Sequence, residues 1–185
     1  EIIFLHPSLF REAFPPRFVN NIYLDSVNQR CYYESINGYP HRVKVRIRWY
    51  GQLFGLIEKP ILELKIKNGL VGTKISHRLK PFSIDDRLTL GVVRDVIDAS
   101  NMPDGLKLEL KGWNFALLNR YQRKYFLSEN KAYRLTIDMM VEFFQLHPLH
   151  NRFLNASKDM LSTIIELKYS IDKDEGADSI SKHLP

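Results

Sequence analysis

The sequence predicts a mainly β protein with about eight strands, two or three short helices and antiparallel pairing. Long stretches alternate apolar and polar residues, as half-buried strands do. Two Asn-Gly pairs, Asn37-Gly38 and Asn68-Gly69, mark tight turns, and most links between strand candidates are short. The chain has 185 residues, of which 44% are hydrophobic, enough for one domain with its own core. A strand-rich chain of this size closes into a barrel or folds into a sandwich.

The N-terminal half is expected to hold one short helix followed by five strands. The helix covers residues 6–14 and is ended by Pro15-Pro16, because proline cannot continue a helix. Alternation replaces helical spacing after that point. The strand candidates are residues 19–26, 30–35, 41–50, 60–67 and 73–79.

The C-terminal half is expected to start with an amphipathic helix. Ser83 followed by Asp86 is typical of a helix cap, and apolar residues recur at helical spacing from Leu88 to Ile97. Pro103-Asp104-Gly105 should end this helix in a turn. The remaining candidates are strands at 122–128, 133–144 and 163–170, a helical segment at 155–161, and a polar tail from 172 that ends in a short helix or loop.

The composition limits the classes of function. A net charge of +6 points to a polyanionic partner such as nucleic acid, an anionic membrane or phosphates, although a mildly basic protein is an equally good interpretation. The single cysteine, Cys31, excludes an internal disulfide framework and a cysteine-based zinc cluster. No apolar run is long enough to cross a bilayer and no signal segment opens the sequence, so a cytoplasmic location is the simplest interpretation.

The strand candidate at 41–50 concentrates positive charge on one face. Its cations alternate with Val43, Val45, Ile47 and Trp49, and the strand itself carries no acid. Side chains two residues apart lie roughly 7 Å from each other on the same face. At an effective dielectric constant of about 20, each such pair of cations costs about 2 kcal/mol. The charged face is therefore either a site for anions or an ordinary face exposed to solvent. The cations are Arg42, Lys44, Arg46 and Arg48.

Three other strands also have one apolar face and one charged face. Alternation leaves two arrangements open: apolar faces inside with the charges in water, or charges inside a tunnel covered by helices. Arg and Lys suit phosphate oxygens, and a few carboxylates among them suit Mg²⁺ or Mn²⁺ bridging phosphates. A salt bridge to a neighbouring lysine is the more ordinary role for such a carboxylate. The charged residues are Glu63, Lys65, Lys67, Arg134, Asp138, Glu166 and Lys168.

Six stretches resemble, in order, the VTC-type polyphosphate polymerase domain of the triphosphate tunnel metalloenzymes, or CYTH superfamily. One such motif would be weak, but six in the right order over most of residues 17–170 are specific. Leu24, Ser26 and Met139 depart from the family pattern. The stretches are NNIYLDS (20–26), RVKVRIRWYG (42–51), LELKIK (62–67), NRYQRKYF (119–126), YRLTID (133–138) and IELKY (165–169).

The resemblance implies an antiparallel eight-stranded closed β-tunnel with flanking helices, whose basic residues bind a nucleotide triphosphate and the growing polyphosphate. Glu166 would hold Mn²⁺ or Mg²⁺, with Glu63 and Asp138 as weaker metal candidates. The inward position of Arg123 rests on the resemblance alone, because Tyr121 and Tyr125 share its strand face. The implied catalytic residues are Arg46, Arg48, Lys65, Arg123, Arg134 and Glu166, and the substrate-binding set adds Lys44, Lys67, Lys74 and Lys168.

The resulting hypothesis is one triphosphate-tunnel domain over residues 1–185, without the family's N-terminal Glu/Lys-rich strand and C-terminal Lys-bearing segment. It would transfer the γ-phosphate of ATP to inorganic polyphosphate. Hydrolysis of inorganic triphosphate, a nucleotide or an RNA 5′-triphosphate on the same scaffold is the nearest alternative. A non-catalytic polyphosphate- or nucleic-acid-binding module is a third. Sequence-specific nucleic-acid binding is not expected, because no aromatic residue lies among the cations of strand 41–50.

Overall fold

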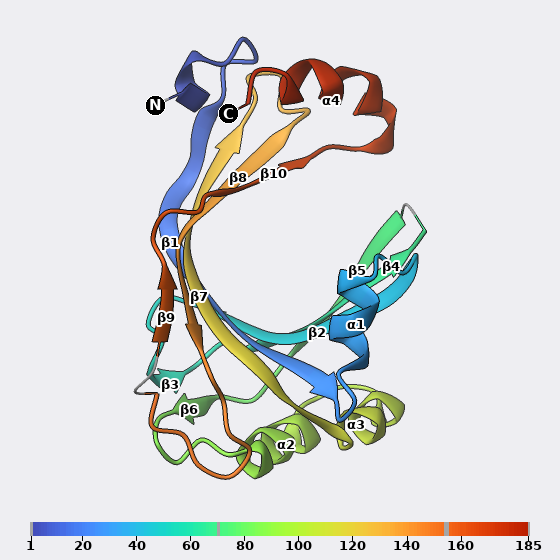
Figure 1. Cartoon of the computed structure of the whole chain (residues 1–185), viewed down its shortest axis with the longest axis vertical. Coiled ribbons are helices and arrows are strands. Elements are labelled where there is room, and N and C mark those ends of the chain that lie inside the picture. The colour runs from blue at the N-terminus through green and yellow to red at the C-terminus, as the bar shows by residue number, and fades with distance from the viewer. Residues whose placement is uncertain (1, 70, 154–155, 185) are drawn as a thin grey trace. The chain divides into compact units, whose positions relative to one another are not determined.

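The computed structural model describes residues 2–69, 71–153 and 156–184 (Figure 1). Strands are the main regular structure of this part of the chain, with four α-helices and two 3-10 turns between them. In chain order the elements are η1 (Ile2–Leu5), β1 (Arg11–Ser26), α1 (Arg30–Ile36), β2 (His41–Tyr50), β3 (Gly55–Ile57), β4 (Ile61–Asn68), β5 (Val71–Arg78), β6 (Phe82–Ile84), α2 (Leu90–Ala99), α3 (Asp104–Leu110), β7 (Trp113–Leu127), β8 (Arg134–Phe144), β9 (Ala156–Asp159), β10 (Ile164–Lys168), η2 (Ile171–Lys173) and α4 (Asp174–Ser181).

One large sheet of eight strands dominates the fold. Its hydrogen-bonded order is β10-β8-β7-β1-β2-β4-β5, β9 pairs with β8, and β3 and β6 form a separate two-stranded sheet. The pairs β1–β2, β2–β4, β4–β5 and β8–β10 are antiparallel. The predicted mainly β, antiparallel fold is therefore confirmed, while closure of the sheet into a tunnel stays a prediction.

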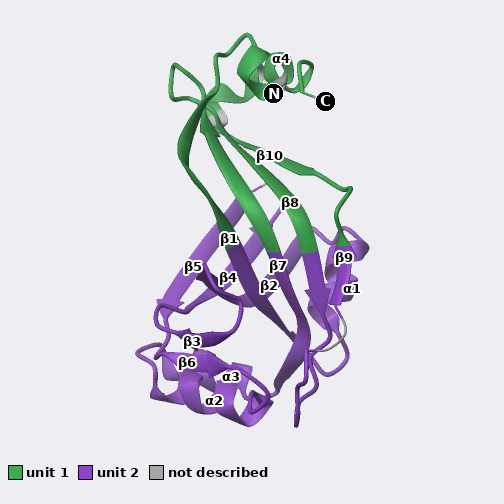
Figure 2. Ribbon diagram, turned by 90° about the vertical axis from the view of Figure 1, so that its left-hand side faces the viewer, with its two compact units in different colours: residues 1–18, 121–141, 159–185 green, residues 19–120, 142–158 purple. Residues whose placement is uncertain are grey.

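The chain divides into two compact units (Figure 2). Unit 1 comprises residues 1–18, 121–141 and 159–185, and unit 2 comprises residues 19–120 and 142–158. Each unit has its own hydrophobic core. None of the helices in the described part of the chain is long and apolar enough to cross a membrane.

The core of unit 2 forms on the apolar face of β2. Val45, Ile47 and Trp49 are buried there, together with side chains from β4. Val93 and Ile97 of α2 belong to the same core cluster, and Figure 1 shows α2 next to α3. The apolar face of β2 thus belongs to the same core as α2, and the cations of β2 point to the other face of the sheet.

The core of unit 1 is built from strand residues and the C-terminal helix. Phe126 of β7 and Leu135 of β8 are buried against Ala177 and Ile180 of α4. The ring nitrogen Nε2 of His6 lies 3.1 Å from the carbonyl oxygen of Ile180. Helix α4 is therefore an integral part of this unit.

Gly176 of α4 packs directly against Tyr133. A Cβ at this position would overlap the Tyr133 hydroxyl, which donates a hydrogen bond to the Lys173 carbonyl at 3.0 Å. We expect Gly176→Ala to lower the free energy of unfolding by about 2 kcal/mol, the usual scale of overpacking. Urea denaturation followed by circular dichroism measures it. Gly105→Ala in α3 is the control, because a Cβ there meets no atom within 4 Å. Equal stability of the two variants would contradict the prediction.

The predicted N-terminal helix at 6–14 is wrong, because β1 begins at Arg11 and runs through Pro15-Pro16. Proline lacks an amide hydrogen, but it is tolerated in a strand where no ladder bond is required of it. The pairing of β1 with β2 begins only at Val19, so both prolines lie outside that ladder. The strand predicted at 19–26 is confirmed as the second part of β1.

The strand predicted at 30–35 is also wrong, because these residues form α1. The Asp25 carboxylate accepts hydrogen bonds from the backbone amides of Cys31 and Tyr32, both at 2.9 Å. These contacts satisfy amides at the start of the helix that have no partner within it. A run this short does not separate helix from strand by its pattern alone.

Three predictions between residues 83 and 161 are wrong as well. Ser83 lies in β6, and the hydroxyl of Thr89 caps α2 instead, accepting from the Val92 amide at 3.2 Å. The Pro103-Asp104-Gly105 segment starts α3 rather than ending a helix in a turn. Residues 156–159 of the predicted helical segment form β9, and its first residue, 155, lies outside the described residues.

The remaining strand predictions hold. β2 has the predicted bounds, and β4 and β5 are shifted by one or two residues. The strand predicted at 122–128 is the second part of β7, which begins at Trp113. The strands predicted at 133–144 and 163–170 are β8 and β10.

Candidate functional site

The charged face of unit 2 places like charges directly opposite one another. Lys44 of β2 pairs with Lys65 of β4, which pairs with Lys74 of β5, and Arg42 pairs with Lys67. Directly opposite side chains on a sheet have their Cβ atoms about 5 Å apart, and like charges in this relation are destabilising. We call these five residues the cation ladder. In β2, β4 and β5, which the structure describes throughout, Glu63 is the only acidic residue. The arrangement favours a polyanion above this face.

Glu63 connects three of the surrounding cations. Its Oε2 accepts hydrogen bonds from Nε and Nη2 of Arg46 at 2.8 and 2.6 Å, and its Oε1 accepts one from Lys74 Nζ at 3.0 Å. Arg48 Nη1 lies 3.8 Å from Oε2. The side chains of Arg46, Arg48 and Glu63 are only 7%, 8% and 5% exposed. One buried carboxylate therefore fixes the guanidinium of Arg46 and leaves the face positive.

The ionisation of Glu63 follows from these contacts. Burial alone raises the pKa of this carboxyl, but the charge of Arg46 and the hydrogen bonds from Lys74 and Arg46 outweigh burial and hold the pKa at about 2. The Arg46 pKa is raised, because Tyr23 and Glu63 outweigh the effect of its burial. Both partners are charged at neutral pH.

Two asparagines position the guanidinium of Arg48, and neither was predicted from the sequence to belong to the site. Arg48 Nε donates to Asn21 Oδ1 at 2.7 Å, and Asn21 Nδ2 donates to Asn119 Oδ1 at 2.8 Å. Tyr23 also lies on this face, and its hydroxyl oxygen accepts from Arg46 Nη1 at 3.4 Å. Asn21 and Tyr23 lie opposite Arg48 and Arg46, and this register is visible only in the structure.

The charged face of unit 1 contains a third anchored arginine. Arg123 donates from Nε and Nη2 to the two carboxylate oxygens of Asp138, both at 2.6 Å. Burial lowers the pKa of Arg123, but the hydrogen bond to Asp138 and neighbouring charges raise it overall. The guanidinium also lies 5.3 Å from the ring centroid of Tyr121. This two-point contact fixes the plane of the guanidinium.

Glu166 lies on the same side of unit 1 with looser contacts. Its Oε1 lies 3.4 Å from Lys168 Nζ, its Oε2 lies 3.9 Å from Arg123 Nη2, and the side chain is 40% exposed. Directly opposite Glu166 on β8 is Thr136, and Lys168 is opposite Arg134. The Thr136 hydroxyl oxygen is buried, with no hydrogen-bond partner among the described residues.

The comparison with protein families decides the relationship of the chain. The profile of the VTC domain matches residues 16–184. The chain belongs to the VTC domain family. The resemblance seen in the six sequence stretches is therefore confirmed.

Two solved structures similar to this VTC domain share little sequence with it. One similar solved structure is a putative adenylyl cyclase from Hippeastrum, HpAC1, described as having a dominant triphosphatase activity. It shares 12% identity and a TM-score of 0.46, over 93% of this chain and 76% of that one. Another is the PH1819 protein from Pyrococcus horikoshii OT3, with 15% identity and a TM-score of 0.47, over 98% and 79%. No curated protein matches the sequence.

The carboxylates of the VTC domain differ in how well they suit a metal ion. Both oxygens of Glu63 and both oxygens of Asp138 accept hydrogen bonds from cations. Glu166 has only long contacts to cations, and the orphaned Thr136 hydroxyl is its cross-strand neighbour. Within the described residues no three His, Cys, Asp or Glu side chains form a metal cluster. This donor set fits Mg²⁺ or Mn²⁺, which often keep several waters and use one or two carboxylates plus substrate phosphates.

The structure gathers the predicted site residues into one set per unit. In unit 2 they share the charged face of β2, β4 and β5, and in unit 1 they lie on β7, β8 and β10. The first set is Lys44, Arg46, Arg48, Glu63, Lys65, Lys67 and Lys74, and the second is Arg123, Arg134, Asp138, Glu166 and Lys168.

Proposed function

We propose that this VTC domain is a phosphotransferase that moves the γ-phosphate of ATP onto a growing chain of inorganic polyphosphate, in a basic β-tunnel and with a divalent metal ion. The cation ladder of unit 2 is the observation that carries the proposal. Membership of the VTC family supports a triphosphate-handling domain. A cytoplasmic location, favoured by the single free cysteine, is part of the proposal.

The extent of the charged face favours a polymeric substrate. The four cations of β2 lie at every second position from Arg42 to Arg48, a distance of about 20 Å at about 3.3 Å per residue. This span is longer than one triphosphate group. Polyphosphate repeats one negative unit along its length, so it can neutralise successive rows of cations at once.

The reaction needs two phosphate groups held in line. A terminal oxygen of the polyphosphate chain attacks the γ-phosphorus of ATP, the bond from this phosphorus to the β–γ bridging oxygen breaks, and ADP leaves with that oxygen. The polyphosphate is then one phosphate longer. Positioning and charge neutralisation provide most of the catalysis in phosphoryl transfer.

The anchored arginines suit this requirement. Arg46 is held by Glu63 and Arg48 by Asn21, so neither guanidinium has to be ordered when substrate binds. Arg123, held by Asp138, plays the same part in unit 1, where Arg134 and Lys168 add charge. Lys44, Lys65, Lys67 and Lys74 bind phosphate oxygens as point charges.

The metal ion belongs to Glu166 in this proposal. When bound, Mn²⁺ or Mg²⁺ neutralises charge on the phosphates during transfer. Glu63 and Asp138 serve mainly as counter-charges that orient arginines, because their oxygens already accept hydrogen bonds from cations.

The deciding experiment is incubation of the protein with ATP and Mn²⁺ followed by gel analysis of the products. Long polyphosphate supports the proposal. Orthophosphate alone indicates a hydrolase, and salt-sensitive binding without turnover indicates a binding module.

The cation ladder makes a separate prediction about affinity. Lys65→Met is expected to weaken binding of inorganic tripolyphosphate about tenfold, the scale of one lost charge-assisted hydrogen bond. Lys59→Met is the matched control, because Lys59 is exposed and lies outside the strands of the charged face. Isothermal titration calorimetry measures both. Equal affinities would exclude Lys65 from the binding face.

A further inference from the structure

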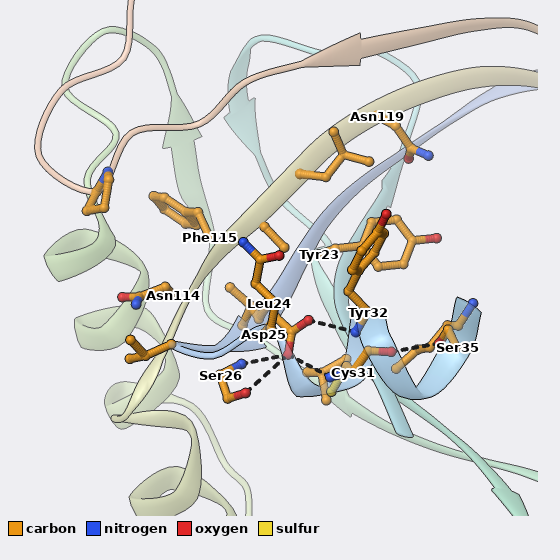
Figure 3. Close-up of a pocket in the computed structure, with 17 residues that line it drawn as sticks. Tyr23, Leu24, Asp25, Ser26, Cys31, Tyr32, Ser35, Asn114, Phe115 and Asn119 are labelled. Atoms are coloured by element: carbon orange, nitrogen blue, oxygen red, sulfur yellow. Dashed lines mark hydrogen bonds between the residues drawn. The ribbon is translucent and has the colours of Figure 1, made fainter. Parts of the chain in front are cut away.

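Unit 2 contains a cavity of about 750 Å³ that the phosphate chemistry does not require (Figure 3). It is lined by the end of β1, by α1, by Lys44 and Val45 of β2, and by the first half of β7. Its volume lies within the range of small-molecule sites, about 300 to 1,000 Å³.

The walls of the cavity combine aromatic rings with polar groups. Tyr23, Tyr32 and Phe115 supply rings, and Asn114 and Asn119 supply amides. Aromatic faces stack on planar bases, and amides both donate and accept hydrogen bonds. This chemistry differs from that of the cation ladder and suits a planar, polar organic group.

The helical wall of the cavity is held in place by Asp25. Besides the amides of Cys31 and Tyr32, its carboxylate accepts a hydrogen bond from the Ser26 amide at 2.7 Å (Figure 3). The Ser35 hydroxyl donates to the Cys31 carbonyl at 2.7 Å. Burial, followed by the charge of Asp25, raises the pKa of the Cys31 thiol to about 12, so this cavity contains no reactive thiolate.

The cavity is continuous with the phosphate-binding face. Lys44 lines the cavity and also belongs to the cation ladder, opposite Lys65. Tyr23 lines it too, and its hydroxyl accepts a hydrogen bond from Arg46. The Lys44 ammonium has no ion pair within the described residues. A ligand with one planar end and one phosphorylated end would therefore contact both regions.

We infer that this cavity binds the nucleoside part of a nucleoside triphosphate whose phosphates lie on the charged face. The inference rests on the proposed function and assigns a place to the nucleoside of its ATP substrate, since inorganic triphosphate or polyphosphate has no group for the rings and amides. Successive rows of the sheet lie roughly 7 Å apart along each strand. The phosphate next to the nucleoside lies at Lys44, and the terminal phosphate points toward Arg46 and Arg48.

Two tyrosines of α1 provide a matched test. Tyr32 lines the cavity and Tyr33 does not, although their rings are 5.4 Å apart and they are 55% and 52% exposed. Tyr32→Ala is expected to weaken ATP binding about tenfold, as loss of one base–aromatic stack does, and to leave inorganic tripolyphosphate binding unchanged. Tyr33→Ala should change neither affinity. Isothermal titration calorimetry with both ligands measures them.

A second variant tests the volume of the cavity. Asn114→Trp should fill part of it and again weaken binding of ATP but not of tripolyphosphate. If neither variant changes ATP affinity, or if both ligands lose affinity equally, the cavity is not the nucleoside site, and the proposed function still stands on tripolyphosphate binding. If the unaltered protein binds neither ligand, the proposed function fails and the inference fails with it.

Discussion

Replacement of the buried carboxylate in unit 2, Glu63→Gln, is expected to lower the free energy of unfolding by about 3 kcal/mol at pH 7. The amide cannot neutralise the cations that now contact Glu63, and Arg46 and Arg48 are both buried. Removing one partner of a buried ion pair leaves an uncompensated charge, which costs more than the pair itself contributed. Urea denaturation of both proteins measures the difference.

The same variant has a defined pH dependence. The folded-state pKa of Glu63, about 2, lies below its ordinary value of 4.5, so the carboxylate stabilises the folded state above about pH 4.5. This contribution is lost as the pH falls from 4.5 toward 2. The stability difference between the unaltered protein and Glu63→Gln should therefore be constant near neutral pH and shrink in that acidic window.

The control for this prediction is Glu58→Gln. Glu58 belongs to the same unit, but its side chain is exposed and the structure records no ion pair for it among the described residues. Its replacement should change stability by less than about 0.5 kcal/mol. A Glu63→Gln protein as stable as the Glu58→Gln protein would show that Glu63 is not the charge that holds Arg46.

The strands of the charged face were the most predictable part of the fold. Residues 42–49 alternate over eight positions, so one register error would have moved every apolar side chain of this stretch to the opposite face of the sheet. The segment 30–35 carried no such constraint, and its helix depends on a carboxylate at Asp25, outside the segment itself. The sequence pattern within 30–35 contained no information about this contact.

The charged residues of the candidate site could be predicted from the sequence, but the side chains that position them could not. The cations of β2 and β4 followed from alternation, but the register that sets Lys44 opposite Lys65 depends on tertiary pairing. The contacts of Asn21 with Arg48 and Asn119 join residues 27 and 98 positions apart. A neutral amide in a strand has no distinctive signal, so its role appears only when its partners are known.

Residue type alone did not show which carboxylates pair with arginines and which could bind a metal ion. Glu63 and Asp138, both buried, each hold an arginine through short contacts of 2.6 Å. Glu166 has the same functional group as Glu63, yet it is partly exposed and its nearest cation lies 3.4 Å away. Burial and contact distance, rather than charge, separate a structural counter-ion from a carboxylate available for metal.

Glu166→Ala is expected to lower metal-dependent turnover by roughly 100-fold, since a metal ion supplies several kcal/mol of charge stabilisation in phosphoryl transfer. Stability should change by less than about 1 kcal/mol, because a partly exposed ion pair contributes little. Glu63→Gln, by contrast, is expected to lower the free energy of unfolding by about 3 kcal/mol. Turnover of ATP at increasing Mn²⁺ and urea denaturation measure the two effects.

A matched control for Glu166→Ala is available in the same unit. Glu129 is exposed and pairs with Arg11 at 3.5 Å, close to the 3.4 Å between Glu166 and Lys168. Glu129→Ala should leave turnover and Mn²⁺ binding unchanged. Titration of Mn²⁺ with tripolyphosphate present should show binding by this control and much weaker binding by Glu166→Ala. Equal Mn²⁺ affinity in both variants would assign the metal to other residues, because each variant loses one exposed or partly exposed carboxylate that pairs with one cation at a similar distance.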